Sequence, residues 1–153
     1  MSRLLVDGDA LRREGESQFE MEAWVDSAPF EVLLGMTIEE AREGRAVLTM
    51  PFRVKLAMGG GYMHGGALTA LADTAVAMAI KSLLPAGTVF ATIELTSRFL
   101  APVKEGTVTA TASVTGPEER TFRGEAVLAD EGGREVLRFT ALFKVARGQG
   151  IGE

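Results

Sequence analysis

The sequence predicts an α+β domain in which a curved antiparallel sheet wraps around one long central helix. The first observation is an apolar, alanine-rich stretch of helical length, residues 65–84, in which Asp73 and Lys81 are the only charged side chains. A helix that is apolar almost all round is buried, and six alanines within residues 65–84 let a sheet lie close to it. The second observation is that two strand-like segments precede this stretch and four follow it, without a repeat or a long linker.

Two shorter helices are expected before the long one. Residues 7–23 are polar and acidic, with Leu11 among their few apolar contacts, and are predicted to form a surface helix. This helix would belong to an N-terminal extension of residues 1–27. Ser27 is then placed to cap a short second helix, and Gly35 to end it.

Six strands are expected from the alternation of apolar side chains with polar or small ones, the period typical of a half-buried strand. They are centred on residues 36–40, 44–52, 89–99, 107–114, 122–128 and 137–145. Turn-forming residues separate them, as at Gly132-Gly133. The domain is therefore predicted to cover residues 28–146, followed by a frayed tail at residues 147–153.

Composition limits the classes of function. With 153 residues the chain has the size of one domain, and its net charge of −5 provides no basic surface for nucleic acid. The absence of cysteine and the single histidine exclude disulfides, a cysteine nucleophile, and metal sites built from thiolates or several histidines. The first residues lack the apolar core of a signal peptide, and residues 65–84 are too interrupted by charge to span a bilayer. A cytoplasmic location without membrane contact is therefore expected.

A candidate site lies at the start of the long helix, where His64, Gly65 and Gly66 follow a glycine run. The first N–H groups of a helix have no intrahelical partner and the helix dipole favours negative charge there, so these groups can stabilise an oxyanion. Glycine lets a ligand approach this backbone closely. Asp73, an acid in an apolar helix, needs a partner or a chemical role. It lies about 13 Å along the helix from His64, so one site that uses both requires two subunits.

The stretch HGGALTALADTA, followed by IELTSRFLAPVKEG, resembles the hot-dog-fold acyl-CoA thioesterases, nearest the phenylacetate-pathway and 4-hydroxybenzoyl-CoA types. The resemblance covers residues 28–146 and implies a hot-dog fold and hydrolysis of an acyl-CoA thioester to free acid and CoA. It implies Asp73 as general base or nucleophile, the Gly65 N–H as oxyanion donor, and His64 and Gly66 as contacts for the thioester. It also implies a site at the seam of a homodimer or a tetramer of paired dimers, with no cofactor beyond the CoA of the substrate.

Several further positions bear on this resemblance. Met58 stands where the family usually has Asn or Gln, so either Tyr62 or a water supplies the missing donor or the activity is weaker or different. Thr92 aligns with a hydroxyl that some relatives use, although strict alternation turns it away from the apolar face of its strand, so its role depends on a sheet-edge or bulged position. Arg120 and Arg123 either meet the phosphates of CoA or belong to a solvated strand face.

Two other functions stay open. A hot-dog dehydratase or hydratase acting on acyl thioesters also uses a histidine and a carboxylate, although its local motif differs. A non-catalytic acyl-CoA-binding regulator is the other, because Met58 removes a donor that the family uses. Release of free thiol distinguishes hydrolysis from both.

Overall fold

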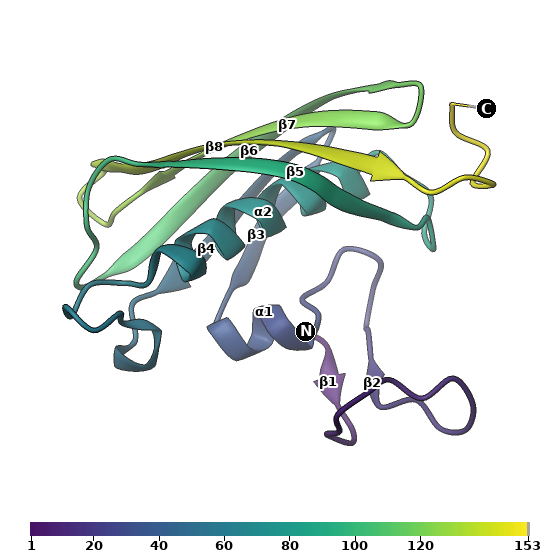
Figure 1. Cartoon of the computed structure of the whole chain (residues 1–153), viewed down its shortest axis with the longest axis horizontal. Coiled ribbons are helices and arrows are strands. Elements are labelled where there is room, and N and C mark those ends of the chain that lie inside the picture. Colours follow the sequence, from purple (N-terminus) through teal and green to yellow (C-terminus); the bar gives the residue numbers. More distant parts are fainter. Residues whose placement is uncertain (153) are drawn as a thin grey trace.

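The computed structural model describes residues 1–152 and confirms the expected fold, a six-stranded antiparallel sheet packed on one long helix (Figure 1). The helices are α1 (Pro29–Leu34), a short 3-10 turn η1 (Val54–Leu56) and the long helix α2 (Gly65–Lys81). The sheet strands are β3 (Thr37–Arg42), β4 (Arg45–Pro51), β5 (Phe90–Phe99), β6 (Thr107–Glu118), β7 (Thr121–Ala129) and β8 (Glu135–Val145). Their order is β3-β4-β6-β7-β8-β5, so β3 and β5 form the two edges of the sheet.

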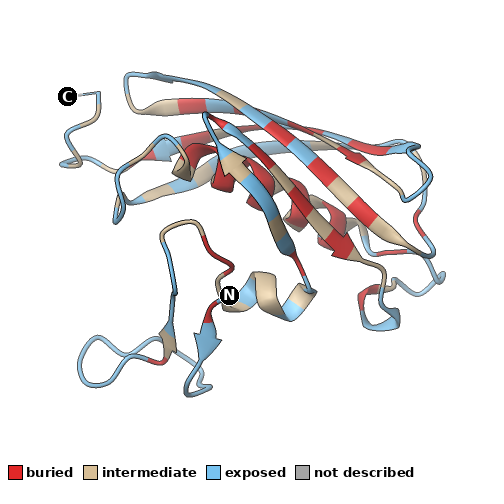
Figure 2. Cartoon of the chain, turned by 180° about the vertical axis from the view of Figure 1, so that it is seen from behind, coloured by how far each residue is buried: buried red, intermediate tan, exposed pale blue. Residues whose placement is uncertain are grey.

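Alternation along the strands gives the sheet one buried face, which packs on α2 (Figure 2). In β4, Ala46, Leu48 and Met50 are buried, whereas the residues between them are partly exposed. Strand β7 passes so close to the helix at Gly124 that a Cβ there would overlap Val76 Cγ1. The buried alanines of α2 fit this close packing, as the composition of the helix led us to expect.

Turns and helix ends follow local sequence signals. Residues 43–44 both have positive φ, which closes β3 and β4 into a tight hairpin. Gly35 takes the left-handed conformation, with φ 80°, and ends α1. The N-cap of α1 is Ala28 rather than the expected Ser27, whose N–H instead donates to Asp26 Oδ1 at 2.8 Å.

The prediction of a surface helix over residues 7–23 is wrong. The N-terminal extension instead forms an arm with one short pair of strands, β1 (Arg3–Leu4) and β2 (Phe19–Glu20) (Figure 1). Leu11, an apolar contact of the expected helix, is 74% exposed. Gly15 has φ +92°, which a right-handed helix does not contain. A helix without a buried apolar stripe is marginal in water, so turns and loops replace it here.

The tail over residues 147–152 contains no helix or strand and lies beside the start of β5. Val89 N–H donates to Gln149 Oε1 at 3.0 Å, and the side chain of Ile151 packs against the core. Fraying of the tail stays a prediction, and Glu153 lies outside the described residues.

Two features of residues 1–152 bear on function. No helix in that range is long and apolar enough to cross a membrane. In the same range, no group of three or more histidine, aspartate or glutamate side chains is arranged to hold a metal ion.

Candidate active site

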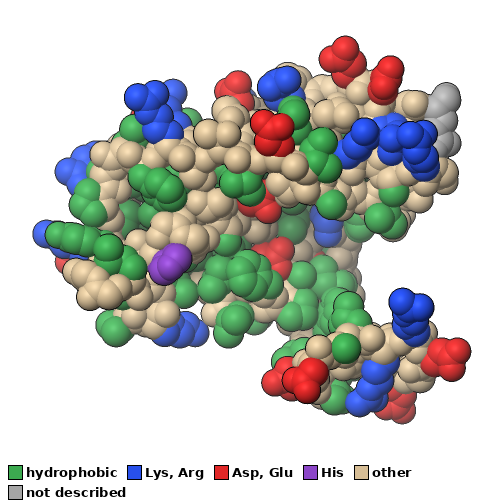
Figure 3. All heavy atoms as spheres, viewed as in Figure 1, with side chains coloured by type: hydrophobic (Ala, Val, Ile, Leu, Met, Phe, Trp, Pro, Cys, Tyr) green, Lys and Arg blue, Asp and Glu red, His purple; other side chains and the backbone are tan. Residues whose placement is uncertain are grey.

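The start of α2 presents two hydrogen-bond donors. His64 is the N-cap, and its Nδ1 accepts a hydrogen bond from the Gly66 N–H at 2.8 Å. Because Nδ1 accepts, the proton of the neutral ring is on Nε2, which can donate to a bound group. The Gly65 N–H is the first of the helix and has no partner within it. The imidazole is exposed, and Figure 3 shows the histidine at the surface among hydrophobic side chains.

The two glycines have different parts in this arrangement. Gly65 lies beneath the ring of Phe99, so that a Cβ at this position would be 3.1 Å from Phe99 Cζ. Any larger residue would push the ring away from the helix start. The Gly66 N–H is already used by His64, so in this conformation Gly66 orients the imidazole rather than offering its amide to a ligand.

A cavity of about 310 Å³ opens beside the helix start. It is lined by Phe30, Leu34, Lys55, Leu56, Ala57, His64, Gly66 and Ala67. The lining is mostly apolar, with one lysine and the exposed imidazole as its polar side chains. The cavity therefore suits an apolar group that enters beside the two donors.

Asp73 lies in the middle of α2 and faces strand β5. Thr92 Oγ1 donates a hydrogen bond to Asp73 Oδ1 at 2.8 Å. The pairing of β5 with β8 shifts register between Thr92 and Glu94, which is a bulge that changes which side chains face the helix. Of the two positions expected to give Thr92 a role, the bulge is therefore present, and the hydroxyl contacts the acid.

The surroundings of Asp73 destabilise its charged form relative to a free aspartate in water. Burial raises the pKa of this carboxyl, the hydrogen bond from Thr92 lowers it, and the negative charge of Glu31 raises it further. The net result is a pKa above the ordinary value for aspartate. An acid that has a raised pKa and lines a cavity is typical of a functional site.

The cavity that Asp73 faces has a volume of about 480 Å³. It is lined by Trp24, Asp26, Ala28, Glu31, Asp73, Thr74, Ala77, Met78, Lys81, Thr88, Val89, Phe90, Ala91, Thr92 and Phe143. None of these residues lines the cavity beside His64. One chain therefore places His64 and Asp73 in different cavities, about 13 Å apart along the same helix.

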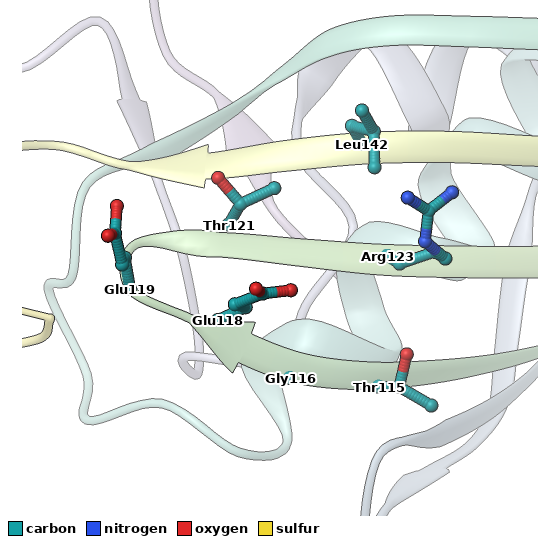
Figure 4. A pocket seen from close by; sticks show the side chains of 7 residues that line it. All are labelled: Thr115, Gly116, Glu118, Glu119, Thr121, Arg123 and Leu142. Atoms are coloured by element: carbon teal, nitrogen blue, oxygen red, sulfur yellow. The ribbon is translucent and has the colours of Figure 1, made fainter.

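The other expected binding residues line neither of these cavities. Met58 N–H donates to Tyr62 O at 2.7 Å in the loop before α2, and both side chains are exposed. Arg120 Nη1 donates to Val145 O at 2.9 Å, which fixes it at the end of β8. Arg123 lies in a separate polar groove of about 460 Å³ on the sheet, between Thr115 and Leu142, and two glutamates line the same groove nearer the turn from β6 to β7 (Figure 4). Within one chain, neither arginine reaches His64 or Asp73.

Trp24 and Glu31 line the cavity of Asp73, although the sequence did not single them out. Both lie more than 40 residues before Asp73 along the chain, so no local pattern connects them to it. The one available signal was that Trp24 is the only tryptophan of the chain.

Comparison with known proteins then assigns the chain to a family. The sequence model of the Thioesterase superfamily matches residues 60–137. The chain belongs to this superfamily. A protein of Halobacterium salinarum that is named an esterase is 31% identical over 137 residues, which is 83% of this chain and 91% of the relative. The 1,4-dihydroxy-2-naphthoyl-CoA hydrolase of Listeria monocytogenes is 33% identical over 99 residues, which is 64% of this chain and 80% of the relative.

A solved structure gives the same result at the level of the fold. The PaaI protein of the phenylacetic acid degradation operon of E. coli is 29% identical, with a TM-score of 0.72, over 80% of this chain and 87% of that structure. The hot-dog fold and the thioesterase class predicted from the sequence are therefore confirmed. The region that matches the superfamily contains His64, Gly65, Asp73 and Thr92, but not Trp24.

Proposed function

We propose that this thioesterase hydrolyses an acyl-CoA thioester at a site shared by two copies of the chain. The observation that carries the proposal is the separation of Asp73 from His64 and Gly65, by about 13 Å and about 12 Å along one helix. A carbonyl held by the Gly65 N–H is out of reach of Asp73 in the same chain. A two-fold axis can bring the acid of a second copy to that carbonyl.

In the shared site, the Gly65 N–H and the His64 Nε2–H donate to the thioester carbonyl oxygen and stabilise the negative charge that develops there. Asp73 from the second copy takes a proton from a water molecule whose oxygen attacks the carbonyl carbon. The C–S bond then breaks, and the CoA thiolate leaves and takes up a proton. Direct attack by the carboxylate, giving an anhydride that water hydrolyses, would use the same residues. Both routes need Asp73 in its ionised form.

Strand β5 offers a surface for the second copy. It is an edge strand of the sheet and pairs with β8 on one side only. Ile93 and Phe99 on this strand are 56% and 53% exposed. A long edge strand with exposed apolar side chains is prone to pair with another chain. Antiparallel pairing of two β5 strands about a two-fold axis would bury these side chains and bring the two α2 helices together.

The identity of the acyl group is proposed from the cavity and from the relatives. The rings of Phe90 and Phe143 pack together, with centroids 6.1 Å apart, on the wall of the cavity that holds Asp73. One relative is named as the hydrolase of an aromatic acyl-CoA. Apolar acyl groups, aromatic ones included, therefore fit this wall best.

A thiol-release screen across short, medium, long and aromatic acyl-CoAs tests the proposal. We expect turnover with at least one of these classes and loss of that turnover in Asp73→Asn. Hydration of an enoyl thioester without thiol release, or tight acyl-CoA binding without any reaction, would contradict the proposal. The cytoplasmic location expected from the sequence stays a prediction.

A further inference from the structure

Trp24 is held against the end of α2 by three contacts with Lys81. Trp24 Nε1 donates to Lys81 O at 3.0 Å, and Lys81 Nζ donates to Trp24 O at 3.1 Å. Lys81 Nζ also lies 4.5 Å from the centroid of the indole ring, a cation–π contact. The indole is therefore fixed in place, and the arm that carries it is tied to the helix.

The fixed indole lies at the opposite end of the cavity from the acid. Lys81 follows Asp73 by eight residues, which corresponds to about 12 Å along the helix. Apolar side chains line the cavity beside these two ends, including Ala77 and Met78 from α2 and Phe90 from β5, together with the polar side chains of Glu31 and Thr74. An acyl group whose carbonyl is close to Asp73 therefore has an apolar path of limited length before it meets the ring.

Two of the charged groups at this end have hydrogen-bond or ion-pair partners, while a third, Glu31, lines the cavity and acts electrostatically on both Lys81 and Asp73. The ammonium of Lys81 contacts the Trp24 carbonyl and ring, and Asp26 Oδ1 pairs with the N-terminal ammonium of Met1 at 2.8 Å. Asp26 is also bonded by the N–H groups of Glu22 and Ser27. The apolar surface that an acyl chain would meet here is therefore the part of the indole that the Lys81 ammonium does not cover.

We propose that Trp24 forms the end wall of the acyl cavity and limits the length of the acyl group that the enzyme accepts. The inference rests on the proposed function, because it takes the Asp73 cavity as the acyl site. The wall comes from a segment outside residues 60–137, the part that matches the superfamily. The selected substrates are apolar acyl-CoAs whose acyl group ends before the indole.

The test compares Trp24→Ala and Trp24→Phe with the wild type over a series of straight-chain acyl-CoAs. For each protein, kcat/KM with an acyl chain two methylenes longer than the wild-type optimum is divided by kcat/KM at that optimum. One methylene in an apolar pocket changes kcat/KM by roughly 10- to 200-fold, so Trp24→Ala should raise this ratio at least about tenfold. Trp24→Phe retains a ring and should give a smaller rise.

Leu33→Ala is the matched control, because Leu33 is an exposed apolar residue of neighbouring α1 that lines neither cavity. It should leave the length profile unchanged. Each ratio is taken on one preparation, so it does not depend on how much of a variant is folded. An unchanged ratio in Trp24→Ala would overturn the proposal, even if the overall rate fell.

Dissociation constants for non-hydrolysable acyl-CoA thioethers give a second measurement of the same profile. If the wild type released no thiol, the proposed function would fail, while these constants would still test the end wall. A shift toward longer acyl chains in Trp24→Ala supports the wall. The same binding profile in the variant and the wild type rejects it.

Discussion

Replacing Thr92 by valine removes one hydrogen bond and tests whether Asp73 acts as a base. Thr92 Oγ1 donates to Asp73 Oδ1 at 2.8 Å, and this bond lowers the pKa of the acid against the effect of burial. Valine has nearly the same size as threonine and lacks the hydroxyl. The pKa of Asp73 should therefore rise further, and the ionised form should be lost at a higher pH than in the wild type.

The size of the effect follows from the bond and its exposure. A hydrogen bond to an ionised group contributes about 1.5–3 kcal/mol. Asp73 is only partly buried, so water replaces part of this interaction and the lower end of the range applies. About 1.4 kcal/mol corresponds to a factor of ten in rate. On the acidic side of the profile, kcat/KM should therefore fall about tenfold, while the plateau at higher pH is retained.

The assay is the pH dependence of kcat/KM by thiol release. Ser97→Ala is the matched control, because Ser97 Oγ and Thr69 Oγ1 form a hydrogen bond of 2.8 Å between the same strand and the same helix, without contact to Asp73. The acid limb should move to higher pH in Thr92→Val and stay in place in Ser97→Ala. An unmoved limb in Thr92→Val, or one moved to lower pH, would refute the reasoning.

Three further predictions concern Glu31, Asp73 and Gly124. Glu31→Gln removes a negative charge that raises the pKa of Asp73, so the acid limb of kcat/KM should move to lower pH; a limb moved upward would be inconsistent with this. Asp73→Asn should lower kcat about 10²- to 10⁴-fold with little change in the binding of thioether analogues, and near-normal turnover would assign the acid a structural role. Gly124→Ala should destabilise the fold in urea by about 1–3 kcal/mol because its Cβ overlaps Val76 Cγ1, and adding Val76→Ala should restore part of this loss.

Much of the fold could be predicted because its signals are local. The alanine-rich helix, the alternation along β4 and the turn at residues 43–44 each depend on a few consecutive residues. The prediction of a surface helix over residues 7–23 failed because it too depended on local signals alone. Its polarity was compatible with a helix, but Leu11 finds no core to pack on, and Gly15 adopts a left-handed turn.

The site could be predicted only in part. His64 and Gly65 were identifiable because capping is a property of consecutive residues at a helix start. The contact of Thr92 with Asp73 depends on a bulge in the pairing of β5 with β8, and a bulge between distant strands leaves no local sequence pattern. The approach of Trp24 to Lys81 is likewise set by how the arm docks on α2, across 57 residues of chain.

Complementation between two inactive variants tests the shared site most directly. His64→Ala and Asp73→Asn are mixed under conditions in which subunits exchange. In a mixed dimer, the Asp73→Asn chain supplies an intact His64 and the other chain supplies an intact Asp73, so one site of two is restored. With random exchange roughly half of the dimers are mixed, and about a quarter of wild-type activity should return. If both residues of a site came from one chain, every site would keep a lesion. A mixture that stays inactive after demonstrated exchange would contradict the shared site.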